Sequence, residues 1–418
     1  MTKRRQKIAY SGLLAILCTA MIAPLVAAAN DAGSGEGSSL RQGLYFLCGL
    51  IALIAYRREK TGSLFKMIPY MFVVYLIWAG ISILWSLDPG TAARRFALTL
   101  LVVVSIFVLI SIAGYADSID AIRKVLIVIL VANFASVIFF PGWSIHQTDV
   151  IDPSIIGAWH GVLEQKNFAG LVCAMTVIFF ITDAKKEKAI VKNTVVFFAI
   201  LFLYKTESKT SAGMLVLALF SGFAIRRYKP YYAGVMALFA ALFISLIVVL
   251  GYAYWDLLVA PFQSEDALTG RVQIWPVLIQ YWKDHWLLGS GYGSFWNIQG
   301  PQPISAYTSS WVGKMMSGHN GYLDQLVQTG LVGIVLLILG VVVAPLISIF
   351  SNRNLSDDQR SLVFSVFIFC ILHNLTESSL LDRDSIGNVF YVISLALIEA
   401  KSENSLARLD NVRLLSAN

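Results

Sequence analysis

The chain alternates between long apolar stretches and short polar ones. Twelve stretches come close to the roughly 20 apolar residues that a helix needs to cross a bilayer, and they cover residues 10–29, 40–56, 67–85, 96–114, 125–140, 168–182, 190–204, 211–225, 231–254, 328–350, 361–376 and 386–400. This pattern predicts an all-α, polytopic integral membrane protein with about twelve transmembrane helices.

The same pattern divides the chain into three parts. Residues 1–254 are predicted to form transmembrane helices 1–9 with short loops, 255–327 a large loop containing short helices, and 328–418 helices 10–12 and a short tail. The basic N-terminus, Lys3 to Lys7, and the apolar run that ends at Ala29 resemble a signal peptide. Because many spans follow, a retained first helix is the favoured interpretation.

Composition and charge support a membrane protein and give its orientation. Hydrophobic residues make up 57% and charged residues 14% of the chain, whereas a soluble domain carries about 25% charged residues; a soluble enzyme is therefore excluded. With the N-terminus inside, 22 of the 32 Lys and Arg residues fall on the cytoplasmic side, as the positive-inside rule requires. The net charge of +7 thus reflects topology, and nucleic acid is not an expected partner.

This topology, with both termini cytoplasmic, places the candidate chemistry outside. All five histidines and the large loop fall on the outer side, where no ATP or nucleotide sugar is available. The four cysteines lie in apolar stretches and show no metal-ligand spacing. Asp382 and Asp384 form an Asp-x-Asp pair, which is a weak and common signal for a divalent ion. We therefore expect no metal and no cofactor.

The large loop has an internal order. Residues 271–286 carry apolar side chains at helical spacing, which predicts an amphipathic helix lying along the outer leaflet. A glycine-rich segment follows, in which Gly291, Tyr292 and Gly293 are candidates for a phosphate or sugar site because glycine allows close backbone approach. The alternative interpretation is a tight turn that re-enters the bilayer.

His319 is the strongest candidate for a catalytic base. It lies in the segment Ser317-Gly318-His319-Asn320-Gly321-Tyr322-Leu323-Asp324, at the water–membrane boundary and at the predicted start of a helix. A helix N-terminus disfavours a protonated imidazole, so the ring could accept a proton. The alternative is a structural or merely exposed histidine.

Outer-facing cations form a second group of candidates. They run against the positive-inside bias, and an anionic ligand at the outer interface would explain them; snorkelling to lipid headgroups is the alternative. They lie at the ends of predicted spans: Lys166, Lys209, Arg94 and Arg95.

Three stretches of this chain resemble the O-antigen ligase and polymerase superfamily, and within it the ExoQ-type exopolysaccharide polymerases. Thr269-Gly270-Arg271 followed by Trp275, then Leu287 to Trp296, match a G-R-x-x-x-W and P-L-L-G-x-G-x-G-x-F-W pattern. His319-Asn320, nine residues and Gly330-x-x-Gly333 match H-N-x9-G-x-x-G. The third stretch is Gly157-x-Trp159-x-Gly161 with Lys166-Asn167, in which His160 replaces an expected Arg.

The resemblance implies a GT-C-like glycosyltransferase architecture and an active site facing the periplasm from the bacterial inner membrane. The implied donor is a polyprenyl (undecaprenyl) diphosphate-linked oligosaccharide, and the implied acceptor a growing polysaccharide. The implied roles are catalytic for His319 and Arg271 and substrate-binding for Lys166, Lys209, Arg94, Arg95, His160, Asn320, Asp324, Gly291, Tyr292 and Gly293. Asn320 and Asp324 would position the imidazole, and transfer would be metal-independent and invert the anomeric carbon. Membrane lipid, a chain-length regulator and export proteins are the expected partners.

Three alternatives remain open. A ligase that moves finished glycan onto lipid A core or protein would share the fold, donor and histidine. A transporter of polysaccharide or lipid-linked sugar could also have twelve spans with both ends inside, although its ionisable residues would lie at the midplane. A structural subunit of a polysaccharide assembly would need none of these side chains.

Overall fold

The computed structural model describes residues 3–30, 39–57, 67–147, 155–185, 187–229, 271–352 and 354–400. Apart from one isolated bridge between Ile145 and Trp159, the regular structure in these ranges is helical. The helices are α1 (Lys3–Asn30), α2 (Ser39–Arg57), α3 (Tyr70–Ile81), η2 (Ser82–Trp85), α4 (Pro89–Ala113), α5 (Tyr115–Phe139), α6 (Pro141–Ser144), α7 (Lys166–Ile181), α8 (Ala189–Lys205), α9 (Lys209–Ile225), α12 (Arg271–Asp284), η7 (Pro303–Ala306), η8 (Trp311–Lys314), α13 (Gly321–Leu337), the π-helical η9 (Ile338–Val343), α14 (Ala344–Ser351), α15 (Asp357–His373) and α16 (Ile386–Glu399).

The predicted apolar stretches coincide with described helices, except for 231–254, which lies outside the described residues. By length and composition α4, α5 and the unit Gly321–Ser351 can each cross a membrane, and shorter apolar helices accompany them. The chain is thus of the membrane-protein type, while the number of spans stays a prediction.

α13 begins at Gly321, close to His319, because the Asn320 side chain accepts hydrogen bonds from the amides of Tyr322 and Leu323. α15 ends at His373. The start of α13 and the end of α15 place polar residues at the same end of the bundle.

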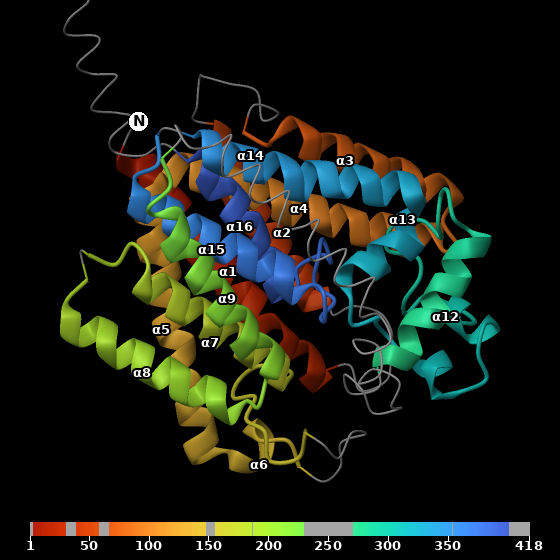
Figure 1. Ribbon diagram of the computed structural model, residues 1–418, viewed down its shortest axis with the longest axis horizontal. Coiled ribbons are helices and arrows are strands. Elements are labelled where there is room, and N and C mark those ends of the chain that lie inside the picture. The colour runs from red at the N-terminus through yellow and green to blue at the C-terminus, as the bar shows by residue number, and fades with distance from the viewer. Residues whose placement is uncertain are drawn as a thin grey trace, which may run out of the picture.

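The helices pack into a bundle whose neighbours are often distant in sequence. α15 packs against α9, α1 against α2, and α16 against α4. In Figure 1, α12 and the short helices of the large loop lie beyond one end of α3 and α13. The predicted apolar face of α12 is confirmed: Ile274, Leu278 and Tyr281 are buried against Phe295 and Val327.

The glycine-rich segment and α13 interlock through their backbones. α13 is broken at Gly330, whose φ of 67° and ψ of −170° suit glycine only. The amides of Ser290 and Gly291 donate to the carbonyls of Val327 and Gln328 at 2.9 and 2.8 Å, and the Leu331 amide donates to Trp286. At the break, backbone groups of α13 therefore form hydrogen bonds with the glycine-rich segment in place of hydrogen bonds within the helix.

Replacing Gly330 with Ala is expected to destabilise the protein by at least about 1–3 kcal/mol, the cost of forcing a side chain into this conformation. A Cβ atom would also lie 2.1 Å from the Leu287 carbonyl oxygen, so the backbone must shift. The thermal unfolding midpoint of the purified protein in detergent measures the effect. Gly213→Ala is the control, because nothing lies within 4 Å of its Cβ position; equal midpoints for the two variants would contradict the prediction.

Candidate active site

Glu377 is the centre of a polar cluster built from four segments. Its Oε1 accepts hydrogen bonds from Arg271 Nη2 at 2.6 Å and from Asn167 Nδ2 at 2.9 Å. Its Oε2 lies 3.7 Å from His319 Nδ1. Arg271 comes from the start of α12, Asn167 from the start of α7, His319 precedes α13, and Glu377 follows α15. The predicted catalytic pair thus meets on a carboxylate that the sequence analysis did not single out.

Backbone contacts hold the loop after α15 against the start of α13. The Gly321 amide donates to the carbonyls of Asn374 and Glu377, both at 2.9 Å. A Cβ on Gly321 would lie 2.4 Å from the Asn374 side chain, so only glycine permits this approach. His319 itself has a left-handed φ of 48°, which turns the chain from the loop into the helix. His319 and Glu377 are therefore placed by two rigidly joined segments.

The environment of Glu377 favours its charged form. Burial alone would raise the pKa of this carboxyl, but the His319 ring and the Arg271 guanidinium outweigh burial and lower the pKa below its usual value. Both members of the Arg271–Glu377 pair are largely buried, with side chains 10% and 13% exposed. The cluster therefore holds a fixed anion between a cation and an imidazole.

Lys166 and Lys209 begin two helices whose next residues reach the same loop. Asn167, beside Lys166, contacts Glu377, and Thr210, beside Lys209, lies 3.3 Å from Thr376 between hydroxyl oxygens. The N-termini of α7, α9 and α13 therefore gather around residues 373–377, and such ends favour anions. The first residues of α7 and α9, Lys166 and Lys209, therefore lie close to the loop that carries Glu377.

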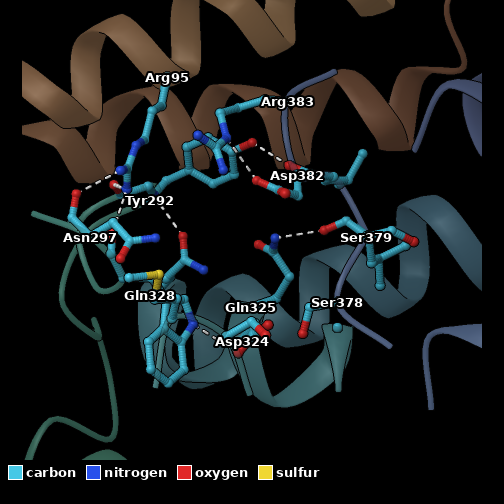
Figure 2. Close-up of a pocket in the computed structure, with 17 residues that line it drawn as sticks. Arg95, Tyr292, Asn297, Asp324, Gln325, Gln328, Ser378, Ser379, Asp382 and Arg383 are labelled. Atoms are coloured by element: carbon cyan, nitrogen blue, oxygen red, sulfur yellow. Dashed lines mark hydrogen bonds and ion pairs between the residues drawn. The ribbon is translucent and has the colours of Figure 1, made fainter. Parts of the chain in front are cut away.

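A polar pocket adjoins the cluster (Figure 2). Ser317 and Gly321, which flank His319, and Ser378, which follows Glu377, are among its lining residues. Its other lining residues include Arg95, Tyr292, Gly293, Gln328, Asp382 and Arg383. The pocket therefore adjoins the two chain segments that carry His319 and Glu377, although neither of these residues lines it.

The pocket cations have partners within the chain. Arg95 donates to the carbonyls of Gly293, Trp296 and Asn297 at 2.6–2.8 Å, and Arg383 Nε donates to Asp382 at 2.8 Å. Arg94, the neighbour of Arg95, is exposed and is not among the lining residues.

The backbone amides of the glycine-rich segment, predicted to form a phosphate or sugar site, have partners within the chain. The amides of Gly291 and Gly293 donate to Gln328 O and Oε1 at 2.8 and 2.6 Å, and that of Tyr292 donates to Ser82 Oγ. These N–H groups are thus occupied by packing against α13 and η2. Tyr292 and Gly293 still line the pocket, whereas Gly291 does not.

Three further predicted residues have contacts other than those expected. Asn320 caps α13 with its side-chain oxygen, and Asp324 accepts hydrogen bonds from Trp296 Nε1 and the Gly318 amide; neither bond goes to the imidazole. His160 is buried, with Nδ1 2.6 Å from the Leu163 carbonyl, and burial lowers its pKa. In the described structure His160 holds its own loop together.

The Asp-x-Asp pair is divided between two arginines. Asp382 is bonded to Arg383, and Asp384 makes a two-pronged ion pair with Arg41 at 2.5 and 2.7 Å. The Arg41–Asp384 ion pair joins the start of α2 to the loop before α16. The two aspartates therefore fix the pocket wall through separate arginines and do not present two carboxylates to one ligand.

Sequence reasoning missed Glu377, the contact made by Asn167, and the pocket residues Gln328 and Arg383, and it considered Asp382 only for a divalent ion. Glu377 had one usable signal: it is an acidic residue immediately after an apolar span in a chain with few charges. Nothing in the sequence indicated that α7, α12 and α13 would bring their first residues to it, since that depends on the packing of the whole bundle.

Comparison with known proteins agrees with the motifs. Residues 194–338 match the family model described as O-Antigen ligase. The exopolysaccharide production protein ExoQ of Rhizobium meliloti (strain 1021) is 27% identical over 139 residues, which cover 32% of this chain. The match covers less than a third (31%) of the length of that protein. These findings confirm the chain's resemblance to the O-antigen ligase and polymerase superfamily, and within it to ExoQ.

Proposed function

We propose that this protein polymerises polyprenyl-diphosphate-linked oligosaccharide repeat units into an exopolysaccharide at the periplasmic face of the inner membrane. One observation carries the proposal: His319 and Arg271, remote in sequence, meet on the single buried carboxylate of Glu377. The family match and the similarity to ExoQ support this choice of reaction.

The reaction is a single displacement at the anomeric carbon of the donor. The acceptor hydroxyl oxygen forms the new glycosidic bond while the bond from carbon to the diphosphate oxygen breaks, so the anomeric configuration inverts. His319 takes the hydroxyl proton. Arg271, with Lys166 and Lys209 at the neighbouring helix starts, binds the diphosphate and stabilises the charge that develops on it. These tasks require no metal and no cofactor.

Glu377 has a positioning role in this mechanism. It fixes the Arg271 guanidinium through one oxygen and lies beside the imidazole through the other. The Glu377 carboxylate thus links Arg271, which binds the diphosphate, to His319, the base.

The proposed placement in the membrane follows the sequence pattern. The chain has about twelve spans in a GT-C-like arrangement, both termini are cytoplasmic, and the cluster faces the periplasm. α12 lies along the outer leaflet. Ile279 of α12 and, just after its end, Trp286, Leu287 and Leu288 are exposed and suited to contact lipid. A chain-length regulator and export proteins are the proposed partners.

A ligase is the second candidate function, favoured by the description of the matched family model. It would transfer finished glycan to lipid A core or protein with the same donor and base. The acceptor alone separates the two reactions.

A mass-spectrometric profile of the lipid-linked glycan pool after gene deletion tests the proposal. We expect single repeat units to accumulate on the lipid, with no long polymer, and complementation with the wild-type gene to restore polymer. Long chains on the lipid with a bare final acceptor would identify the ligase. Repeat units trapped on the cytoplasmic leaflet would mean a transporter, and an unchanged pool would rule out this pathway.

A further inference from the structure

The pocket beside His319 has no role in the proposed chemistry of the diphosphate, although it adjoins the base. Its lining residues include none from α7, α9 or α12, the helices that begin with Lys166, Lys209 and Arg271. They do include Ser317 and Gly321 on either side of His319. A group bound in the pocket therefore lies beside the chain segment that carries His319, although His319 itself does not line the pocket, and apart from those three helix starts.

The charge of the pocket is balanced. Arg95 and Arg383 are matched by Asp324 and Asp382 among the lining residues, and both guanidinium groups already have partners. A diphosphate requires uncompensated positive charge. The pocket instead suits a neutral ligand with several hydroxyl groups.

Two side chains offer the pocket complementary hydrogen-bonding groups. Gln328 accepts from the Gly293 amide with Oε1, and within the described residues no bond is made by its Nε2, which remains a donor for a ligand. Asp382 uses Oδ1 for Arg383, and its side chain is 43% exposed, so Oδ2 can accept. Figure 2 shows Gln328 and Asp382 on opposite sides of the pocket. Donor and acceptor groups at fixed separation recognise sugar hydroxyls.

From these observations we infer that this pocket binds the terminal sugar of the acceptor glycan beside the chain segment that carries His319, with Gln328 and Asp382 determining acceptor affinity. The inference rests on the proposed function, because it names the acceptor subsite of that reaction. The donor diphosphate binds outside the pocket.

The test uses the full-length protein in lipid nanodiscs with two substrates that can be varied separately. The donor is the host's lipid-linked glycan pool. The acceptor probe is the repeat-unit oligosaccharide released from that pool by mild acid, which lacks the diphosphate and can accept but not donate. Initial transfer rates give KM for each substrate and kcat.

Gln328→Glu keeps an oxygen for the Gly293 amide but removes the free donor, and Asp382→Asn keeps the shape but removes the charge. We expect each to raise the acceptor KM at least about tenfold, with kcat and the donor KM within about twofold of the wild type. The matched control is Gln280→Glu, on the exposed side of α12, which should change nothing.

Two results would overturn the inference while the proposed function stands: an unchanged acceptor KM in both variants, or a rise confined to the donor KM. The latter would place donor sugar in the pocket. No transfer by the wild-type protein would defeat the proposed function, and the inference with it.

Discussion

Replacing His319 with Ala is expected to lower the rate of glycan transfer by about 10²–10⁴-fold, the usual contribution of a positioned general base. The donor diphosphate is a good leaving group, so activation of the acceptor hydroxyl is the step that most needs help. Donor binding should change little, because the cations that hold the diphosphate remain. The measurement is the initial rate of repeat-unit transfer in nanodiscs, together with the donor KM.

His285 supplies a matched control for this substitution. It is exposed at the end of α12 and stacks on Tyr281 with ring centroids 4.3 Å apart, but it is not among the pocket residues. His285→Ala should retain transfer within about twofold. If His319→Ala kept full activity, the general-base role would be lost, whatever the control showed.

The sequence was a good guide to elements whose pattern is periodic. Long apolar runs predicted the described helices, and helical spacing predicted which face of α12 is buried, because burial selects side chains locally along one element. The start of α13 just after His319 was predictable for a local reason as well, because the capping side chain of Asn320 stands next to it in the sequence.

The candidate site was predictable in part for the same reason. His319 and Arg271 stand in recognisable motifs, and the structure brings them together. Glu377 belongs to no such motif, since its role arises only where four chain segments meet. The glycines show what residue type alone leaves open: it predicted a phosphate or sugar site or a tight turn, and the structure uses the amides of Gly291 and Gly293 to pack against α13.

Replacing Glu377 with Gln is expected to lower kcat by at least about 10²-fold, because misplaced reacting groups are costly. The amide keeps a carbonyl oxygen for Arg271 and Asn167, but it leaves the buried guanidinium without a counter-charge. Removing one partner of a buried pair costs about 3–5 kcal/mol, so stability should fall as well. Transfer rate and thermal unfolding in detergent are measured together, and Glu377→Asp, which keeps the charge, should restore part of both.

The dependence on pH gives a second signature of Glu377. Its pKa is lower in the folded protein than in an unfolded chain, so its contribution to stability is present above the unfolded value and is lost as the pH falls through the folded value. The wild-type protein should therefore lose stability in acid more steeply than Glu377→Gln. Parallel acid profiles for the two proteins would argue against a charged Glu377.

A double substitution separates the catalytic role of this pair from its structural one. Arg271→Gln together with Glu377→Gln removes both buried charges at once, and neutral replacements of a buried ion pair are often tolerated. We expect the double variant to recover most of the stability that Glu377→Gln loses, but to remain at least as inactive, since the diphosphate has then lost its arginine. Recovery of transfer along with stability would show that the Arg271–Glu377 pair only holds α12 in place.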